Sequence, residues 1–116
     1  MPDQKQAAEL LGADGVEELL AGDDRATVDV YVPEWKKTIR LRQMTAAELF
    51  TISEADKKDG MFLAVSMCAV DAKGNLLFKD PERLRGRSAN AMSLLQNEVM
   101  KLNGLSVNAA GIAKNG

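Results

Sequence analysis

The chain has 116 residues, 46% of them hydrophobic and 28% charged, which is ordinary for one soluble globular domain with one core. Its formal net charge of -2 argues against nucleic acid or an anionic membrane as a partner. It has no histidine and one cysteine, so the commonest general base and most ligands of zinc, copper and haem sites are missing. We therefore expect neither a metal nor a cofactor.

Residues 1–25 predict two short helices with few large apolar residues. Asp3 with Gln6, and Asp14 with Glu17, have the spacing of a helix-capping box. Each box precedes a pair of leucines, namely Leu10, Leu11, Leu19 and Leu20. We interpret this part as a helical N-terminal arm, which is as easily mobile as packed. Residues 26–116 then form the main domain.

Alternating side chains predict an antiparallel β-hairpin near residues 27–42. Valines occupy every second position of residues 28–32, and Pro33 closes this strand because proline cannot donate to a ladder. Alternation resumes at Thr38, with Ile39 and Leu41 on one face and Arg40 and Arg42 on the other. An isolated hairpin is marginal in water, so helices must cover its aliphatic face.

Two helices are expected next. Thr45 and Glu48 form a capping box for a helix that runs to about Lys57 or Lys58, and Asp59-Gly60 interrupts it. Residues 61–70 are apolar almost all round, and Met, Leu, Ala and Cys favour a buried helix over a buried strand. This run is about half of the roughly 20 residues that a membrane-spanning helix needs.

The C-terminal part predicts turns and a strongly amphipathic helix. Residues 71–75 form a turn, and Asp80-Pro81 opens a further helical turn. Ser88 caps the best helix, which Asn103-Gly104 stops, and a weak helix starts near Ser106. We predict an α+β fold: a mostly helical single domain, with about four to six helices and one antiparallel β-hairpin.

The hairpin holds the only tyrosine and the only tryptophan, Tyr31 and Trp35. Exposed aromatics are typical interface anchors, so both are candidate partner-binding residues. For Trp35 we favour the alternative that it folds back as a lid on the core, since a large aromatic is usually mostly buried. For Tyr31 the two interpretations weigh equally.

We interpret the polar face of the second strand as basic, because it carries Lys36, Lys37, Arg40 and Arg42. It is either a patch for an acidic or helical partner or, as we favour, a solvated face whose charges discourage edge-to-edge pairing. Residues 79–88 form a second basic cluster, which we interpret as a solvated short helix and loop. Without histidine to activate a serine, and with acidic pairs only adjacent in sequence, we expect no enzyme.

The order of features across residues 26–115 resembles the tail assembly chaperones of long-tailed phages and prophages. The matching segments are VYVPEWKKTIRLRQMTAAEL, VDAKGNLLF, RGRSANAMSLLQNEVMKLNGLS and the ending AAGIAKNG. Each motif alone is weak, but their order and spacing together are fairly specific. Residues 1–25 carry little of the resemblance.

The resemblance implies a non-enzymatic assembly factor of the host bacterial cytoplasm, absent from the mature virion. Its partners would be the tape measure protein, which it keeps soluble, and the tail tube protein, which it recruits. In many members a ribosomal frameshift yields a longer form, and Ala113-Lys114-Asn115 permit slippery codons. Candidate partner contacts are Tyr31, Trp35, Lys37, Arg40 and Arg42. Self-association stays open, and the alternative is a tail-completion or connector protein retained in the virion.

Overall fold

The first two strands form the predicted antiparallel hairpin. In the computed structural model, which describes residues 9–105, β1 runs Thr27–Val32 and β2 runs Lys37–Arg42. Val30 pairs with Ile39 across the ladder, so aliphatic side chains share one face of the sheet. Pro33 follows β1 directly and ends it.

A third strand, β3, was not predicted. Ala69–Val70 pairs antiparallel with β2, so the sheet has the order β1-β2-β3, and Leu76 forms a further bridge to Val70. The prediction of helix through residue 70 was wrong for these last two residues. Ala69 is extended, and its carbonyl accepts a hydrogen bond from the backbone of Leu77 at 3.0 Å. Pairing with a distant strand thus overrode the local preference for helix.

Helices α3, Ala46–Ser53, and α4, Lys57–Cys68, follow the hairpin. The capping box is confirmed, because the Thr45 hydroxyl accepts from the Glu48 amide and the Glu48 carboxylate accepts from the Thr45 amide. The predicted break at Asp59-Gly60 was wrong, since the break falls at residues 54–56 and both residues lie in the first turn of α4. An acidic residue in a first turn is favoured by the helix dipole and does not end a helix.

The later turns and caps agree with the prediction. Asp80 caps the 3₁₀ helix η2, Pro81–Leu84, by accepting from the Glu82 amide. Ser88 accepts from the Ala91 amide at the start of α5, Ala89–Leu102, and Gly104 has a φ of 73° beyond its end.

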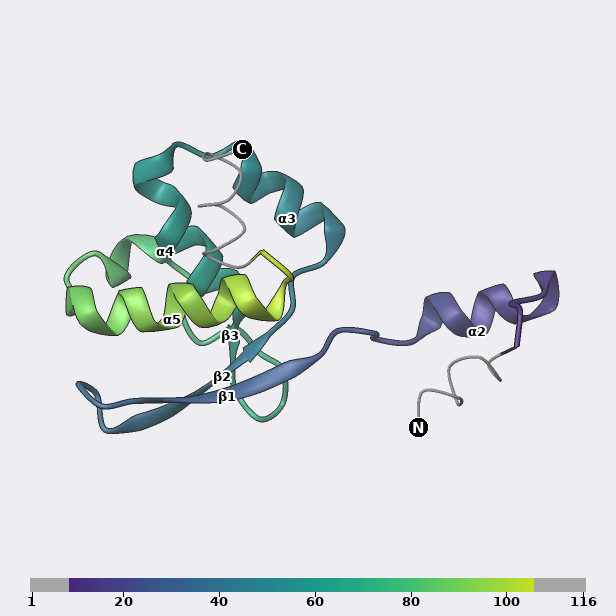
Figure 1. Cartoon of the computed structure of the whole chain (residues 1–116), viewed down its shortest axis with the longest axis horizontal. Helices are drawn as coiled ribbons and strands as arrows, with labels where there is room; N and C mark the ends of the chain where they lie inside the picture. Colours follow the sequence, from purple (N-terminus) through teal and green to yellow (C-terminus); the bar gives the residue numbers. More distant parts are fainter. Residues whose placement is uncertain (1–8, 106–116) are drawn as a thin grey trace.

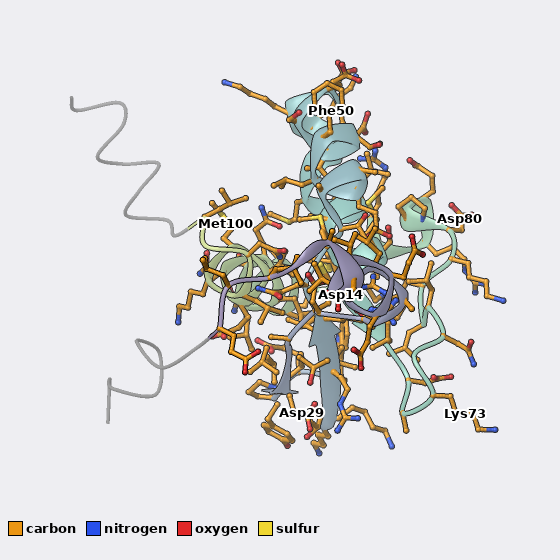
Figure 2. All side chains as sticks on the ribbon, turned by 90° about the vertical axis from the view of Figure 1, so that its right-hand side faces the viewer. Asp14, Asp29, Phe50, Lys73, Asp80 and Met100 are labelled. Carbon is orange, nitrogen blue, oxygen red and sulfur yellow. The ribbon has the colours of Figure 1, made fainter. Side chains whose placement is uncertain are left out.

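The helices α4 and α5 cover one face of the sheet (Figure 1). The core between them is built from the inward side chains of the hairpin, from α4 and from the predicted face of α5. Its fully buried large members are Val32, Leu41, Val65, Cys68, Leu84, Leu95 and Val99. Within residues 9–105 no helix covers the opposite face of the sheet, which we call the outer face. Figure 2 shows Asp29 on the sheet and Phe50 at the far end of the helical part.

The N-terminal helices stand apart from this core. The 3₁₀ helix η1, Ala13–Gly15, leads into α2, Val16–Ala21, which lies away from the sheet (Figure 1). The predicted Asp14 cap was wrong, because Gly15 precedes α2 and no side chain caps it. The predicted helix face at Leu10 and Leu11 was also wrong, since these residues precede η1 and are not helical. The predicted Asp3–Gln6 cap and the helix from Ser106 lie outside the described residues.

Candidate functional site

The outer face of the hairpin carries the exposed candidate residues. Tyr31 pairs with Thr38 across the ladder, and Tyr31 is 57% exposed. Asp29 pairs with Arg40 one step further along the same face. Leu76, which is bridged to Val70 beyond β2, adds an exposed apolar side chain to this face. The outer face therefore combines apolar and polar groups that are open to a partner.

Arg40 and Asp29 neutralise each other. The guanidinium donates two hydrogen bonds to the carboxylate, from Nε to Oδ1 at 2.8 Å and from Nη2 to Oδ2 at 3.0 Å. These bonds lower the pKa of Asp29 and raise the pKa of Arg40. The expected free basic face is therefore absent at this position, and the pair presents a polar, almost neutral surface.

The other two basic residues among the candidate partner contacts, Arg42 and Lys37, are not equivalent to Arg40. Arg42 is half-buried, and its Nη1 donates to the carbonyl of Gly74 at 3.3 Å, so it tethers the turn at residues 71–75. Lys37 is exposed, but the two-residue period of the strand places it with Ile39 on the inward side. The prediction that Lys36 and Lys37 share a strand face with Arg40 was wrong, because Lys36 lies in the turn before β2 and Lys37 lies on the opposite face.

Trp35 lies in the turn between the strands and packs toward the core. It is half-buried, and its ring meets Phe78 edge-on, with centroids 6.1 Å apart and an interplanar angle of 68°. The turn is tight enough to force Lys36 to a positive φ of 53°. The structure thus separates the two candidate aromatics, with Tyr31 on the outer face and Trp35 against the core.

A shallow depression borders the outer face. It has a volume of about 270 Å³ and is lined by Asp29, Thr38, Arg40, Val70, Asp71, Ala72 and Leu77. The turn beside it is rigid, because the Asp71 carboxylate accepts from the backbone amides of Lys73 and Asn75 at 2.8 and 2.9 Å. This turn forms one wall of the depression, through Asp71 and Ala72.

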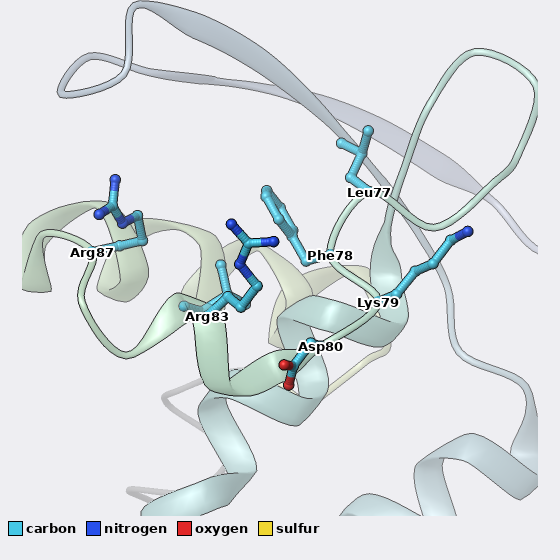
Figure 3. A pocket seen from close by; sticks show the side chains of 7 residues that line it. Leu77, Phe78, Lys79, Asp80, Arg83 and Arg87 are labelled. Carbon is cyan, nitrogen blue, oxygen red and sulfur yellow. The ribbon is translucent and has the colours of Figure 1, made fainter.

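A second depression, which we call the basic groove, follows the segment between the sheet and α5 (Figure 3). Its volume is about 600 Å³, and it is lined by Leu77, Phe78, Lys79, Asp80, Arg83, Leu84 and Arg87. Figure 3 shows the guanidinium of Arg83 on the same side as the Phe78 ring, with the Asp80 carboxylate turned away. These residues were not predicted to form a site. The signal in the sequence was the apolar run 76–78 followed by four cations within residues 79–88. The fold places three of these cations around one hollow.

The described residues offer little chemistry for catalysis. Burial raises the pKa of the Cys68 thiol to about 11, which disfavours the thiolate nucleophile. Within residues 9–105 no three His, Cys, Asp or Glu side chains are grouped to hold a metal ion. In the same range no helix has the length and apolar character required to span a bilayer.

Comparison with known proteins identifies the fold. No family model matches the chain, and no curated protein matches its sequence. The solved structure of the bacteriophage HK97 tail assembly chaperone is similar to it, with a TM-score of 0.58 and 17% sequence identity. The match covers 78% of this chain and 95% of that chain. The fold is therefore the one that the resemblance to tail assembly chaperones implied.

Proposed function

We propose that this protein is a non-enzymatic tail assembly chaperone that binds the tape measure protein in the host cytoplasm and leaves before the virion matures. The observation that carries the proposal is the fold shared with nearly the whole length of the HK97 chaperone. The order of motifs across residues 26–115, which resembles that of tail assembly chaperones, also supports it.

The outer face suits a long helical client. A tape measure helix has apolar faces that aggregate unless they are covered, so its chaperone needs an adaptable surface with some apolar area. Tyr31 and Leu76 supply that area, while the Asp29–Arg40 pair supplies polar groups without a strong net charge. In this arrangement Tyr31 and Arg40 contact the client directly.

The other predicted site residues have supporting roles in the proposal. Trp35 holds the end of the hairpin against Phe78, and Arg42 holds the turn that borders the outer face. Lys37 is exposed at the turn end of β2 but on the side opposite to the outer face, so it would contact only a part of the client that passes beyond the end of the hairpin. Tube subunits would be recruited through a longer, frameshifted form.

Co-purification tests the client contact. The chain is co-expressed with a tagged tape measure protein, and its recovery on the tag is measured. We expect Tyr31→Ala to reduce recovery at least about tenfold, as for an aromatic anchor at an interface. Phe50→Ala is the matched control, since Phe50 is also an exposed aromatic but lies on α3, away from the sheet.

Two results would contradict the proposal. Failure of the wild-type chain to co-purify with the tape measure protein would remove the chaperone role. Detection of the chain in purified virions by mass spectrometry would support the alternative of a retained tail component. The longer form is tested separately by reading the codons for Ala113–Asn115 and the frame that follows, and a spelling without a slippery run and without an overlapping open frame would exclude it.

A further inference from the structure

The N-terminal arm, residues 9–21, exposes leucines that nothing in the described chain covers. Leu19 and Leu20 on α2 are 57% and 70% exposed, and Leu10 and Leu11 before η1 are exposed as well. A six-residue helix is too short to be stable by itself in water, so a surface that covered these leucines would stabilise α2. The arm has no basic residue, and its acidic residues are Glu9, Asp14, Glu17 and Glu18.

The basic groove has the complementary character. Phe78 and Leu77 provide an apolar wall, and three cations surround it, namely Lys79, Arg83 and Arg87. Within residues 9–105 none of these three cations forms a salt bridge. Asp80 is the one acid of the lining; its Oδ1 accepts from the Glu82 backbone amide at 3.0 Å, and its carboxylate is turned away from the Arg83 guanidinium (Figure 3). The groove therefore suits an acidic segment that carries leucines.

The arm does not reach the basic groove of its own chain. In Figure 1 α2 lies at one end of the long axis, and the green segment that carries η2 lies at the other. The molecule extends 48 Å along this axis. The segment that joins the arm to β1 is fixed at Ala26. The backbone amide of Ala26 donates to Gln43 Oε1 at 2.8 Å, and its carbonyl accepts from the Gln43 backbone amide at 2.9 Å. Arg25 is held as well, by salt bridges to Asp23 and Glu48. The three residues between α2 and Arg25 span at most about 10 Å, so α2 stays near this end of the molecule.

We propose that the acidic leucine-bearing arm of one copy binds in the basic groove of a second copy. Leu19 and Leu20 lie against the apolar wall, and Glu17 and Glu18 pair with Arg83 and Arg87. The two surfaces are different, so this contact joins copies head to tail and does not close a two-fold dimer. It concerns this chain alone and does not rest on the proposed client or on the outer face.

Charge reversal at both surfaces tests the contact without a client. Sedimentation velocity of the full chain is measured from low-micromolar to sub-millimolar concentration at low salt. We expect reversible association of the wild type that added salt weakens, because the partners are of opposite charge. We expect E17K/E18K and, separately, R83E/R87E to weaken association at least about tenfold, and an equimolar mixture of the two variants to associate again.

The control is K57E/K58E, which reverses two exposed lysines at the start of α4, outside the groove, and is expected to leave association unchanged. All substituted side chains are exposed, and circular dichroism verifies that each variant is folded. A wild-type chain that stays monomeric overturns the proposal, as does association that survives either groove or arm reversal. Failure of the mixed variants to associate overturns it too. Co-purification with the client tests Tyr31 on the outer face, whereas this experiment tests the arm and the basic groove, so either proposal can fail without the other.

Discussion

Replacing Trp35 by alanine should destabilise the domain without unfolding it. Trp35 is half-buried at the end of the hairpin, where its ring contacts Phe78 edge-on at a centroid distance of 6.1 Å. The substitution removes a large part of the lid over the core and breaks the aromatic pair. We therefore expect Trp35→Ala mainly to lower the free energy of unfolding, in agreement with the interpretation of Trp35 as a lid on the core.

The magnitude follows from the burial and the pair. Truncation of a fully buried tryptophan costs about 3–5 kcal/mol, and a half-buried one loses roughly half of that. An edge-to-face aromatic pair contributes a further ~0.5–1.5 kcal/mol. We expect a loss of about 2–4 kcal/mol for Trp35→Ala, which lowers the melting temperature of a domain of this size by roughly 10–15 °C. Tyr31→Ala, at an exposed position, should cost less than about 1 kcal/mol.

Urea unfolding followed by circular dichroism measures these values, since the substitution removes the only tryptophan and with it the fluorescence signal. A double-mutant cycle with Phe78→Ala isolates the pair, with an expected coupling of about 0.5–1.5 kcal/mol. The reasoning is refuted if Trp35→Ala costs no more than Tyr31→Ala, or if the cycle gives no coupling. Either result would place the Trp35 ring in solvent.

Three further predictions concern single positions. Gly74→Ala should cost about 1–2 kcal/mol in urea unfolding because Gly74 has a φ of +87°, whereas Gly86→Ala, with open space at its Cβ, should change stability by less than about 0.5 kcal/mol. Hydrogen bonds from Arg25 lower the pKa of Asp23 from 3.8 to about 2, so this carboxylate stabilises the fold above pH 3.8 and loses that effect as the pH falls toward 2. Asp23→Asn should accordingly flatten the stability profile in that window, and an unchanged profile would count against the pair. Burial raises the pKa of Cys68 to about 11, so iodoacetamide should alkylate the thiol only after unfolding, and rapid alkylation of the native chain would contradict the packing.

Local patterns predicted those elements whose stabilising contacts are close in sequence. The Thr45–Glu48 box and the Ser88 cap each satisfy backbone amides within a few residues, so their residue types suffice to reveal them. The hairpin is predictable for a similar reason, since its strands are adjacent in the chain and alternate strictly. Each of these features keeps its form wherever the rest of the chain lies.

The errors arose where distant contacts decide. The strand at Ala69–Val70 exists because β2 offers it a free edge, and nothing in its own residues distinguishes it from helix. The neutral outer face depends on Asp29 facing Arg40, which is a matter of cross-strand register. The basic groove needed the sheet, η2 and α5 in place before its three cations surrounded an apolar wall.

Composition and local order by themselves determined the α+β class, the hairpin, the caps at Thr45, Asp80 and Ser88, and the resemblance to tail assembly chaperones. Only the tertiary structure decided which aromatic is exposed, which arginine is neutralised and where the hollows lie. The physical reason is that a cap or a turn is stabilised by groups a few residues apart, whereas burial and ion pairing depend on what the folded chain brings into contact. Tyr31 and Trp35 are four residues apart in the chain, yet they lie on different sides of the sheet.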